Sequence, residues 1–260
     1  RRIPKLDMQN GVPEEYATFI VIPTILDKPE KAKDFLQKLE VFYLANKSEN
    51  VYFALLGDCT ASTRAEEPVD SKIIQTGREM VERLNQKYAE NTMPKFYFFY
   101  RKRTWCEGEE CFLGWERKRG LLTEFNEAVL DGNLEGFAYA SKIPKVRYII
   151  TLDADTDLVL GTGLELIGAM GHILNHPQCN QEGTRVTKGH ALLQPRIGID
   201  LEASILTNFA KIFAGSGGVD SYTNAISDVY QDNFEEGIYT GKGIYDVTVF
   251  SEVLQGKIPE

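Results

Sequence analysis

Continuous apolar runs that alternate with amphipathic segments constrain the fold of this chain more than any other feature. The apolar runs are rich in β-branched and aromatic residues and cover 17–26, 51–59, 95–100 and 146–158. Their continuity is typical of strands that are covered on both faces of a parallel sheet. The segments between them carry apolar residues at helical spacing and cover 29–46, 70–89 and 116–130. The sequence therefore predicts an α/β fold, with a mostly parallel sheet flanked by helices.

The remainder of the chain has a less regular pattern. We expect a loop at 102–115, a helix at 162–175, a strand at 191–199, a helix near 201–213, a Gly- and aromatic-rich stretch at 214–245 and a short helix near 246–254. No internal repeat is visible, and 260 residues are enough for one large α/β domain. We therefore expect a single domain over 1–260.

The charge balance argues against one class of partner. The formal net charge is −9, which disfavours binding to nucleic acid by neutralisation of its backbone. A phosphate ester would need local Lys or Arg side chains, or a divalent cation, to bind this acidic chain. No run reaches the length of a membrane-spanning helix and no signal peptide is visible, so we expect a soluble piece. The start at Arg1 and the end at Glu260 favour a piece of a longer protein.

The sharpest motif is TLDADTDL, which closes the fourth apolar run. Ligands of open α/β sheets bind beyond the carboxyl ends of the strands, where these acids are expected. Asp153 and Asp155 are two positions apart, so on a strand their carboxylates leave the same face and need a cation. Hard oxygen ligands suit Mg²⁺ or Mn²⁺, which we expect here. The alternative is a solvated acidic turn that caps the next helix, with Asp157 as a neighbour or cap.

A basic cluster opens the predicted helix in GWERKRGLLTEFNEAV. Positive side chains at a helix N-terminus oppose the helix dipole, which favours a role in binding an anion together with the helix N–H groups. We expect Lys118 and Arg119 to contact a diphosphate, and Gly120 to allow close backbone approach. The alternative is a solvated basic face held by Glu116 and Glu124.

Further candidates lie near the ends of other strands. Thr24 and Asp58 lie at the ends of the first two runs, and such an acid commonly accepts hydrogen bonds from a base or ribose, although a turn explains it equally well. Trp115 is of a type that stacks on sugars, with packing as the commoner explanation. Gln194 and Arg196 end a late strand as L-Q-P-R, which favours the wall of a site.

The stretch 228–247 combines acids, tyrosines and the G-x-G turn around Lys242. Such glycines let a ligand approach the backbone, and we interpret the stretch as a lid on the acceptor or the donor side. Asp232 and Glu236 are candidates for a general base, as are Asp228 and Glu235.

These motifs resemble an inverting GT-A glycosyltransferase of the family 2 type, through the D-x-D after a strand, the K-R-G helix start and the strand-ending Asp58. More narrowly, the chain resembles the glycosyltransferase domain of cyclic β-1,2-glucan synthases, glycosyltransferase family 84. The runs that carry this resemblance are colinear over nearly the whole chain and include GVPEEYATFIVIPTIL, LGWERKRGLLTEFN, VRYIITLDADT, LLQPRIG, SDVYQDNFEEGIYTGKGIYDV and LQGKIPE.

The resemblance implies a GT-A-like fold, with a nucleotide-binding half at 1–158 and an acceptor-side half at 159–260. It implies UDP-glucose as the donor, Mg²⁺ or Mn²⁺ as the cofactor, and transfer of glucose to a growing β-1,2-glucan acceptor. It also implies a large parent protein whose membrane helices hold this domain at the cytoplasmic face of the inner membrane.

Carried over by motif, the resemblance gives several candidates a role. The donor-binding residues would be Thr24, Asp58, Lys118, Arg119 and Asp153, and the metal ligands Asp153 and Asp155. From the residues themselves, we expect Trp115, Gln194, Arg196 and Lys242 on the acceptor side. The general base of such enzymes usually follows the G-x-G loop on a helix. Such an acid would lie beyond Glu260, and the chain would then bind the donor without turnover. The candidates within the chain, Asp232 and Glu236, precede that loop.

Three other functional classes are the alternatives to this one. A nucleotidyltransferase normally has a Gly-rich basic loop after its first strand, and that position here reads PTILDKPEKAKD, without glycine. A dinucleotide-binding dehydrogenase is disfavoured because no G-x-G-x-x-G follows the first strand. A non-catalytic module that binds a sugar nucleotide or a glucan stays open as the alternative.

Overall fold

The computed structural model describes residues 3–89, 93–194 and 241–254. The strands are β1 (Thr18–Ile25), β2 (Val51–Asp58), β3 (Phe96–Arg101), β4 (Thr104–Cys106), β5 (Cys111–Leu113), β6 (Phe137–Ala140), β7 (Tyr148–Thr151), β8 (Gln178–Cys179), β9 (Val186–Lys188), β10 (Leu192–Leu193) and β11 (Gly243–Asp246). The helices are η1 (Glu14–Tyr16), α1 (Pro29–Ala45), α2 (Pro68–Lys87), α3 (Arg117–Asp131), α4 (Thr162–Gly171), η2 (Ile173–Asn175) and α8 (Val247–Leu254).

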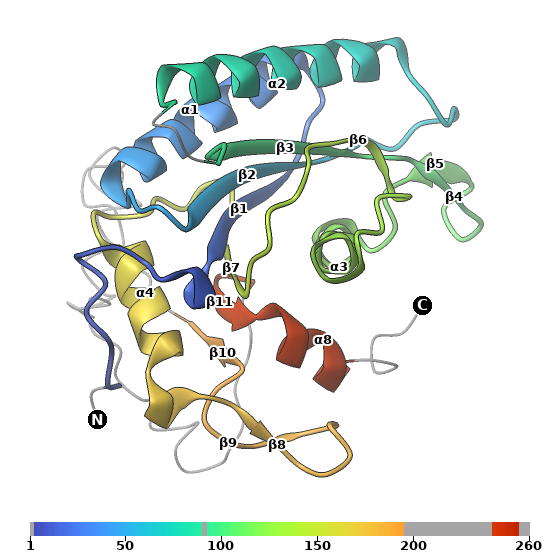
Figure 1. Cartoon of the computed structure of the whole chain (residues 1–260). Helices are drawn as coiled ribbons and strands as arrows, with labels where there is room; N and C mark the ends of the chain where they lie inside the picture. Colours follow the sequence, from blue (N-terminus) through green and yellow to red (C-terminus); the bar gives the residue numbers. More distant parts are fainter. Residues whose placement is uncertain (1–2, 90–92, 195–240, 255–260) are drawn as a thin grey trace, which may run out of the picture.

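A 7-stranded sheet in the order β10-β11-β7-β1-β2-β3-β6 forms the centre of the molecule (Figure 1). Its four middle strands, β7, β1, β2 and β3, run parallel, whereas β10, β11 and β6 add to the edges in antiparallel pairs. The prediction of a mostly parallel sheet flanked by helices is confirmed, and the architecture is consistent with a GT-A-like domain. Because β7, β1 and β2 share one direction, their carboxyl ends meet at a single edge of the sheet.

Helices cover both faces of the sheet, as a doubly covered parallel sheet requires. Ile20 and Ile22 of β1 belong to a buried cluster that includes side chains of α1, α2 and α4. Phe19 and Val21, which alternate with them, belong to a second cluster with side chains of α3 and α8. Successive side chains of β1 thus point to opposite faces of the sheet and belong to two separate cores. Helix α3 lies on the face opposite α1 and α2 (Figure 1).

Several predicted boundaries are wrong. The expected loop at 102–115 contains the β4–β5 hairpin, and the run at 146–158 stops being a strand at Thr151. A turn replaces the strand there, with the backbone N–H of Thr156 bonded to the carbonyl of Asp153 at 3.0 Å. Strands β6 and β11 were not expected at all. The expected helix at 201–213 lies outside the described residues.

The helices that the structure describes include none that is both long enough and apolar enough to cross a membrane.

Candidate functional site

Polar side chains gather at the edge where the parallel strands β7, β1 and β2 end. Thr24 is half-buried near the end of β1, and Asp58, the last residue of β2, is 2% exposed. Asp153 follows β7 two residues beyond Thr151. The carboxyl edge of an open α/β sheet is where ligands bind, so the fold places these predicted residues where a ligand site is expected.

Asp153 is held by two ammonium groups that come from distant parts of the chain. Lys118, in the first turn of α3, donates to Asp153 Oδ1, and Lys242, just before β11, lies 3.0 Å from Asp153 Oδ2. Lys118 Nζ also donates to the carbonyl of Gly241 at 2.9 Å, and the Thr151 hydroxyl donates to the same carbonyl at 3.0 Å. The cluster therefore ties together α3, the end of β7 and the turn that enters β11.

These contacts fix the charge of Asp153. Partial burial acts to raise the pKa of the Asp153 carboxyl, but hydrogen bonds from Lys118 and Lys242 outweigh it, and the pKa is lowered overall. Asp153 is therefore an anion throughout the physiological range of pH. With one carboxylate and two ammonium groups, the cluster carries an excess of positive charge that is suited to an incoming anion.

The other acids and bases of the two motifs lie outside this cluster. Asp155 is exposed, and its Oδ1 lies 3.5 Å from the hydroxyl of Thr156. Asp157 pairs with Lys38 at 2.9 Å on the surface. Arg119 pairs with Glu116 at 2.8 Å and is 46% exposed, an arrangement typical of a solvated helix face.

The donor set of the D-x-D turn fits a hard divalent cation only in combination with a ligand. Within 3–89, 93–194 and 241–254, no three His, Cys, Asp or Glu side chains gather in a way that could hold a metal. Asp153 and Asp155 offer carboxylate oxygens, which suit Mg²⁺ or Mn²⁺, and Mg²⁺ commonly takes one or two carboxylates with its other ligands from substrate phosphates and water. The expectation that the two carboxylates leave one face of a strand is wrong, because β7 ends at Thr151 and a turn follows. Their donor chemistry suits a cation whose other ligands would come from the phosphates of a nucleotide, and this metal site stays a prediction.

Beneath this edge, Arg101 anchors a buried polar network. Its side chain is 1% exposed, and its Nε and Nη2 each donate to one oxygen of Glu124 at 2.9 Å. Its Nη1 donates to the carbonyl of Arg117 at 3.2 Å and lies 3.7 Å from Asp58 Oδ1. One guanidinium thus connects the ends of β2 and β3 to the first turns of α3.

The segment that precedes α3 is shaped around this guanidinium. A Cβ at Gly114 would collide with Asp58 Oδ1 and with Arg101, and one at Gly120 would collide with the carbonyl of Trp115. Glu116 and Arg117 both have left-handed backbones, with φ of 51° and 48°. A residue other than glycine is strained at such φ values, so the surrounding contacts must stabilise this backbone conformation.

Trp115 is part of the same network. Its indole N–H donates to Glu124 Oε1 at 2.6 Å, and the Arg101 guanidinium lies 5.6 Å from the centre of its ring. The side chain is half-buried. These contacts are those of the packing alternative, in which the indole covers the guanidinium.

Asp58 retains one oxygen with no partner. Its Oδ1 accepts the backbone N–H of Cys59 at 2.9 Å, whereas Oδ2 is buried and no hydrogen-bond donor reaches it in the part of the chain that the structure describes. Burial raises the pKa of the Asp58 carboxyl, against the opposing effect of Arg101. Because an unpaired buried acceptor costs roughly 1–3 kcal/mol, this oxygen is a feature that a ligand donor would satisfy.

Comparison with known proteins connects this geometry to a family. The chain is 36% identical over 262 residues to cyclic beta-(1,2)-glucan synthase NdvB of Rhizobium meliloti (strain 1021), with 100% of this chain and 9% of that protein matched. The chain is homologous to a segment of that synthase. No protein-family model matches it. The resemblance to the cyclic β-1,2-glucan synthases that the motifs indicated is therefore confirmed over the whole chain, which spans about a tenth of the length of its relative.

The homology to a glucan synthase does not assign roles to individual residues, and the structure gives only their positions. Lys242, predicted on the acceptor side, lies 3.0 Å from Asp153, which is predicted on the donor side. Gln194 is exposed directly after β10. Arg196, Asp232 and Glu236 lie outside the described residues, and their roles stay predictions.

Residues that the motifs did not single out also shape the site. The sequence predicts Glu124 only as a counterion of a solvated basic face, and it predicts no role for Arg101. The available signal was the occurrence of an arginine at the end of an otherwise apolar strand, FYFFYR, because a buried charge needs a buried partner.

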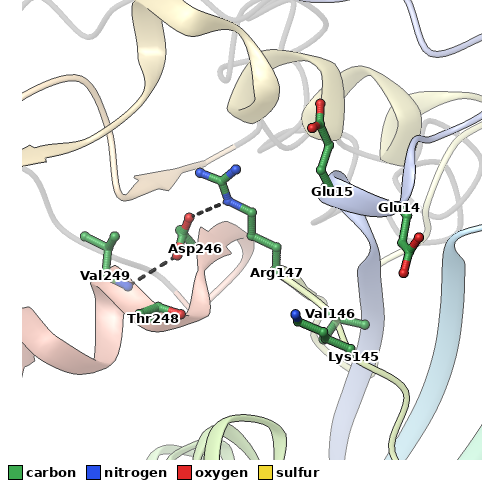
Figure 2. Close-up of a pocket in the computed structure, with 8 residues that line it drawn as sticks. All are labelled: Glu14, Glu15, Lys145, Val146, Arg147, Asp246, Thr248 and Val249. Atoms are coloured by element: carbon green, nitrogen blue, oxygen red, sulfur yellow. Dashed lines mark hydrogen bonds and ion pairs between the residues drawn. The ribbon is translucent and has the colours of Figure 1, made fainter.

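A cavity of about 660 Å³ lies at the opposite edge of the sheet. It is bordered by η1, the segment just before β7, the end of β11 and the start of α8. Arg147 Nε donates there to Asp246 Oδ2 at 3.0 Å (Figure 2). Asp246 also caps α8 through the N–H of Val249 at 3.3 Å. The carboxylate of Asp246 is thus engaged in contacts that hold the fold together. This cavity is separate from the edge of the sheet that carries Asp58 and Asp153.

Proposed function

We propose that this chain is the donor-binding region of an inverting glycosyltransferase, which transfers glucose from UDP-glucose to a growing β-1,2-glucan with Mg²⁺ or Mn²⁺. The observation that carries the proposal is the cluster of Lys118, Asp153 and Lys242 at the carboxyl edge of the sheet. The homology to a glucan synthase supports it independently.

In this proposal the lysines and the start of α3 bind the diphosphate. Lys118 and Lys242 supply positive charge where the departing UDP gains negative charge, and they act without reorganisation of solvent. A divalent cation at Asp153 and Asp155 would supply Lewis-acid stabilisation of the same leaving group. The acceptor hydroxyl attacks the anomeric carbon while a carboxylate takes its proton, and the candidates Asp232 and Glu236 stay predictions.

Asp58 binds the nucleoside in the same scheme. Among the described residues no donor reaches its buried Oδ2, and an N–H of a uracil or a hydroxyl of a ribose would provide one. Thr24 lies on the neighbouring strand at the same edge. We also propose that the domain works in a longer protein with membrane helices, at the cytoplasmic face of the inner membrane.

Calorimetric titration tests the donor assignment. UDP-glucose and UDP are expected to bind the chain in the presence of Mn²⁺, and to bind at least about tenfold more weakly in EDTA, since the cation links the carboxylates to the phosphates. ADP-glucose serves as the matched control for the base. A folded chain that binds none of these ligands would contradict the proposal, and conversion of UTP and glucose 1-phosphate to UDP-glucose would favour a nucleotidyltransferase.

The substitution Asp58→Asn is expected to separate binding from stability. UDP affinity should fall by about 10- to 100-fold, because the amide is a weaker acceptor than the carboxylate. The unfolding free energy at pH 7 should rise, because burial raises the pKa of Asp58 and ionisation therefore costs folded-state stability. That cost appears as the pH rises through the folded pKa and is absent below the unfolded value.

Urea unfolding at several pH values measures this effect. The advantage of Asp58→Asn over the wild type should shrink as the pH falls towards about 4, where the unfolded carboxyl also takes up its proton. Asp34→Asn removes the same charge from the exposed side of α1 and serves as the control. A variant that is less stable than the wild type at pH 7 would show that Arg101 repays the cost of burial.

A further inference from the structure

Lys118 and Lys242 contact the carboxylate of Asp153, which is the group that a divalent cation would bind. Each oxygen of the carboxylate faces one ammonium group, Lys118 on Oδ1 and Lys242 on Oδ2. An ammonium nitrogen and a metal ion compete for the same lone pairs, because both are cations that need an anionic oxygen. The D-x-D carboxylate is therefore occupied by the protein's own cations in the structure.

The cluster is held from several sides and is not a chance surface contact. The side chains of Lys118, Asp153 and Lys242 are 34%, 30% and 19% exposed. Lys118 is fixed a second time by the carbonyl of Gly241. Surface ion pairs are usually single and mobile, whereas here one carboxylate is bonded from α3 and from the entry to β11.

The two ammonium groups on Asp153 oppose the binding of a bare divalent cation. The cation must either share the Asp153 carboxylate with both ammonium groups or displace one of them, and in both cases the nearby ammonium groups repel it. A diphosphate changes this balance because it offers the lysines new anionic oxygens and the cation further ligands. Each ligand then removes the obstacle to the other, which is positive coupling between two sites.

We propose that Lys118 and Lys242 form an exchange clamp, which holds Asp153 in place of the cation and passes to the diphosphate when nucleotide and cation bind together. The inference rests on the proposed function for the nature of the anion. It makes Lys242 a donor-side residue and makes the cation bind weakly to the free chain. The clamp also ties the position of β11 to the occupancy of the site through Gly241 and Lys242.

Lys242→Met tests the clamp, because it removes the charge and keeps most of the side chain. Mn²⁺ binding to the chain without nucleotide, measured from the free-ion signal in electron paramagnetic resonance, should become at least about fivefold tighter than in the wild type. UDP binding in EDTA, measured by calorimetry, should become about tenfold weaker. The factor by which UDP tightens Mn²⁺ binding should shrink accordingly.

Two further variants keep the outcome interpretable. Lys5→Met removes the same charge at the surface pair with Glu165 and should leave both affinities unchanged. Asp153→Asn should abolish Mn²⁺ binding whether or not the clamp exists. Mn²⁺ affinity in Lys242→Met that equals or falls below that of the wild type would overturn the clamp. Absence of UDP binding by the wild type with Mn²⁺ would instead overturn the proposed function, and the Mn²⁺ comparison without nucleotide would still decide whether the lysine competes with the cation.

Discussion

Asp153→Asn is expected to reduce the affinity for UDP-glucose in the presence of Mn²⁺ by at least about 100-fold, the largest binding effect that the site predicts. The amide keeps the size of the side chain but removes the charge that a divalent cation requires. It also leaves Lys118 and Lys242 facing each other without their shared counterion. Calorimetric titration of the variant beside the wild type measures the loss.

The fold should survive this substitution. The three side chains of the cluster are each partly exposed, so the stability that their pairing contributes is only about 0–1 kcal/mol after screening by solvent. Asp157→Asn is the matched control, because Asp157 lies in the same turn, is 78% exposed and pairs only with Lys38 among the described ion pairs. Equal losses of affinity in the two variants would contradict a specific role for Asp153.

Much of the fold could be predicted from the sequence because its signals are local. The strands β1, β2 and β3 are continuous apolar runs, and α1 and α2 carry apolar faces at helical spacing. The edge strands could not be predicted in the same way. Strand β11 has four residues, is entered through a G-x-G turn and exists as a strand through its pairing with β7 and β10.

In the candidate site, too, residues with local sequence signals could be predicted, whereas those placed by long-range pairing could not. Asp153 and Lys118 could be predicted as neighbours of one ligand, because a strand end and a helix start are both recognisable in the sequence. The position of Lys242 depends on β11, which pairs Gly243 with Thr151 and so carries the preceding lysine to Asp153. No local pattern encodes that pairing.

Arg101→Met is expected to lower the unfolding free energy by about 3–5 kcal/mol, because it leaves the other charge of a buried ion pair uncompensated. The guanidinium is 1% exposed, and its removal leaves Glu124 without its bidentate partner and Asp58 without its nearest cation. Arg78→Met is the control, because Arg78 is 56% exposed and its pair with Glu82 spans 3.7 Å. A pair of that kind is worth about 0–1 kcal/mol. Urea unfolding at pH 7 measures both variants.

A second pair of variants shows whether Arg101 also positions the site. Arg101→Lys keeps the charge but loses the two-pronged contact with Glu124 and the bond to the carbonyl of Arg117, which precedes Lys118. Arg101→Met combined with Glu124→Leu removes both charges of the buried pair and should recover part of the stability lost in Arg101→Met. If the network positions Lys118, both variants should bind UDP about tenfold more weakly even where they are folded, because the left-handed turn at Glu116 and Arg117 is no longer imposed. Wild-type affinity in the double variant would instead confine Arg101 to a role in stability.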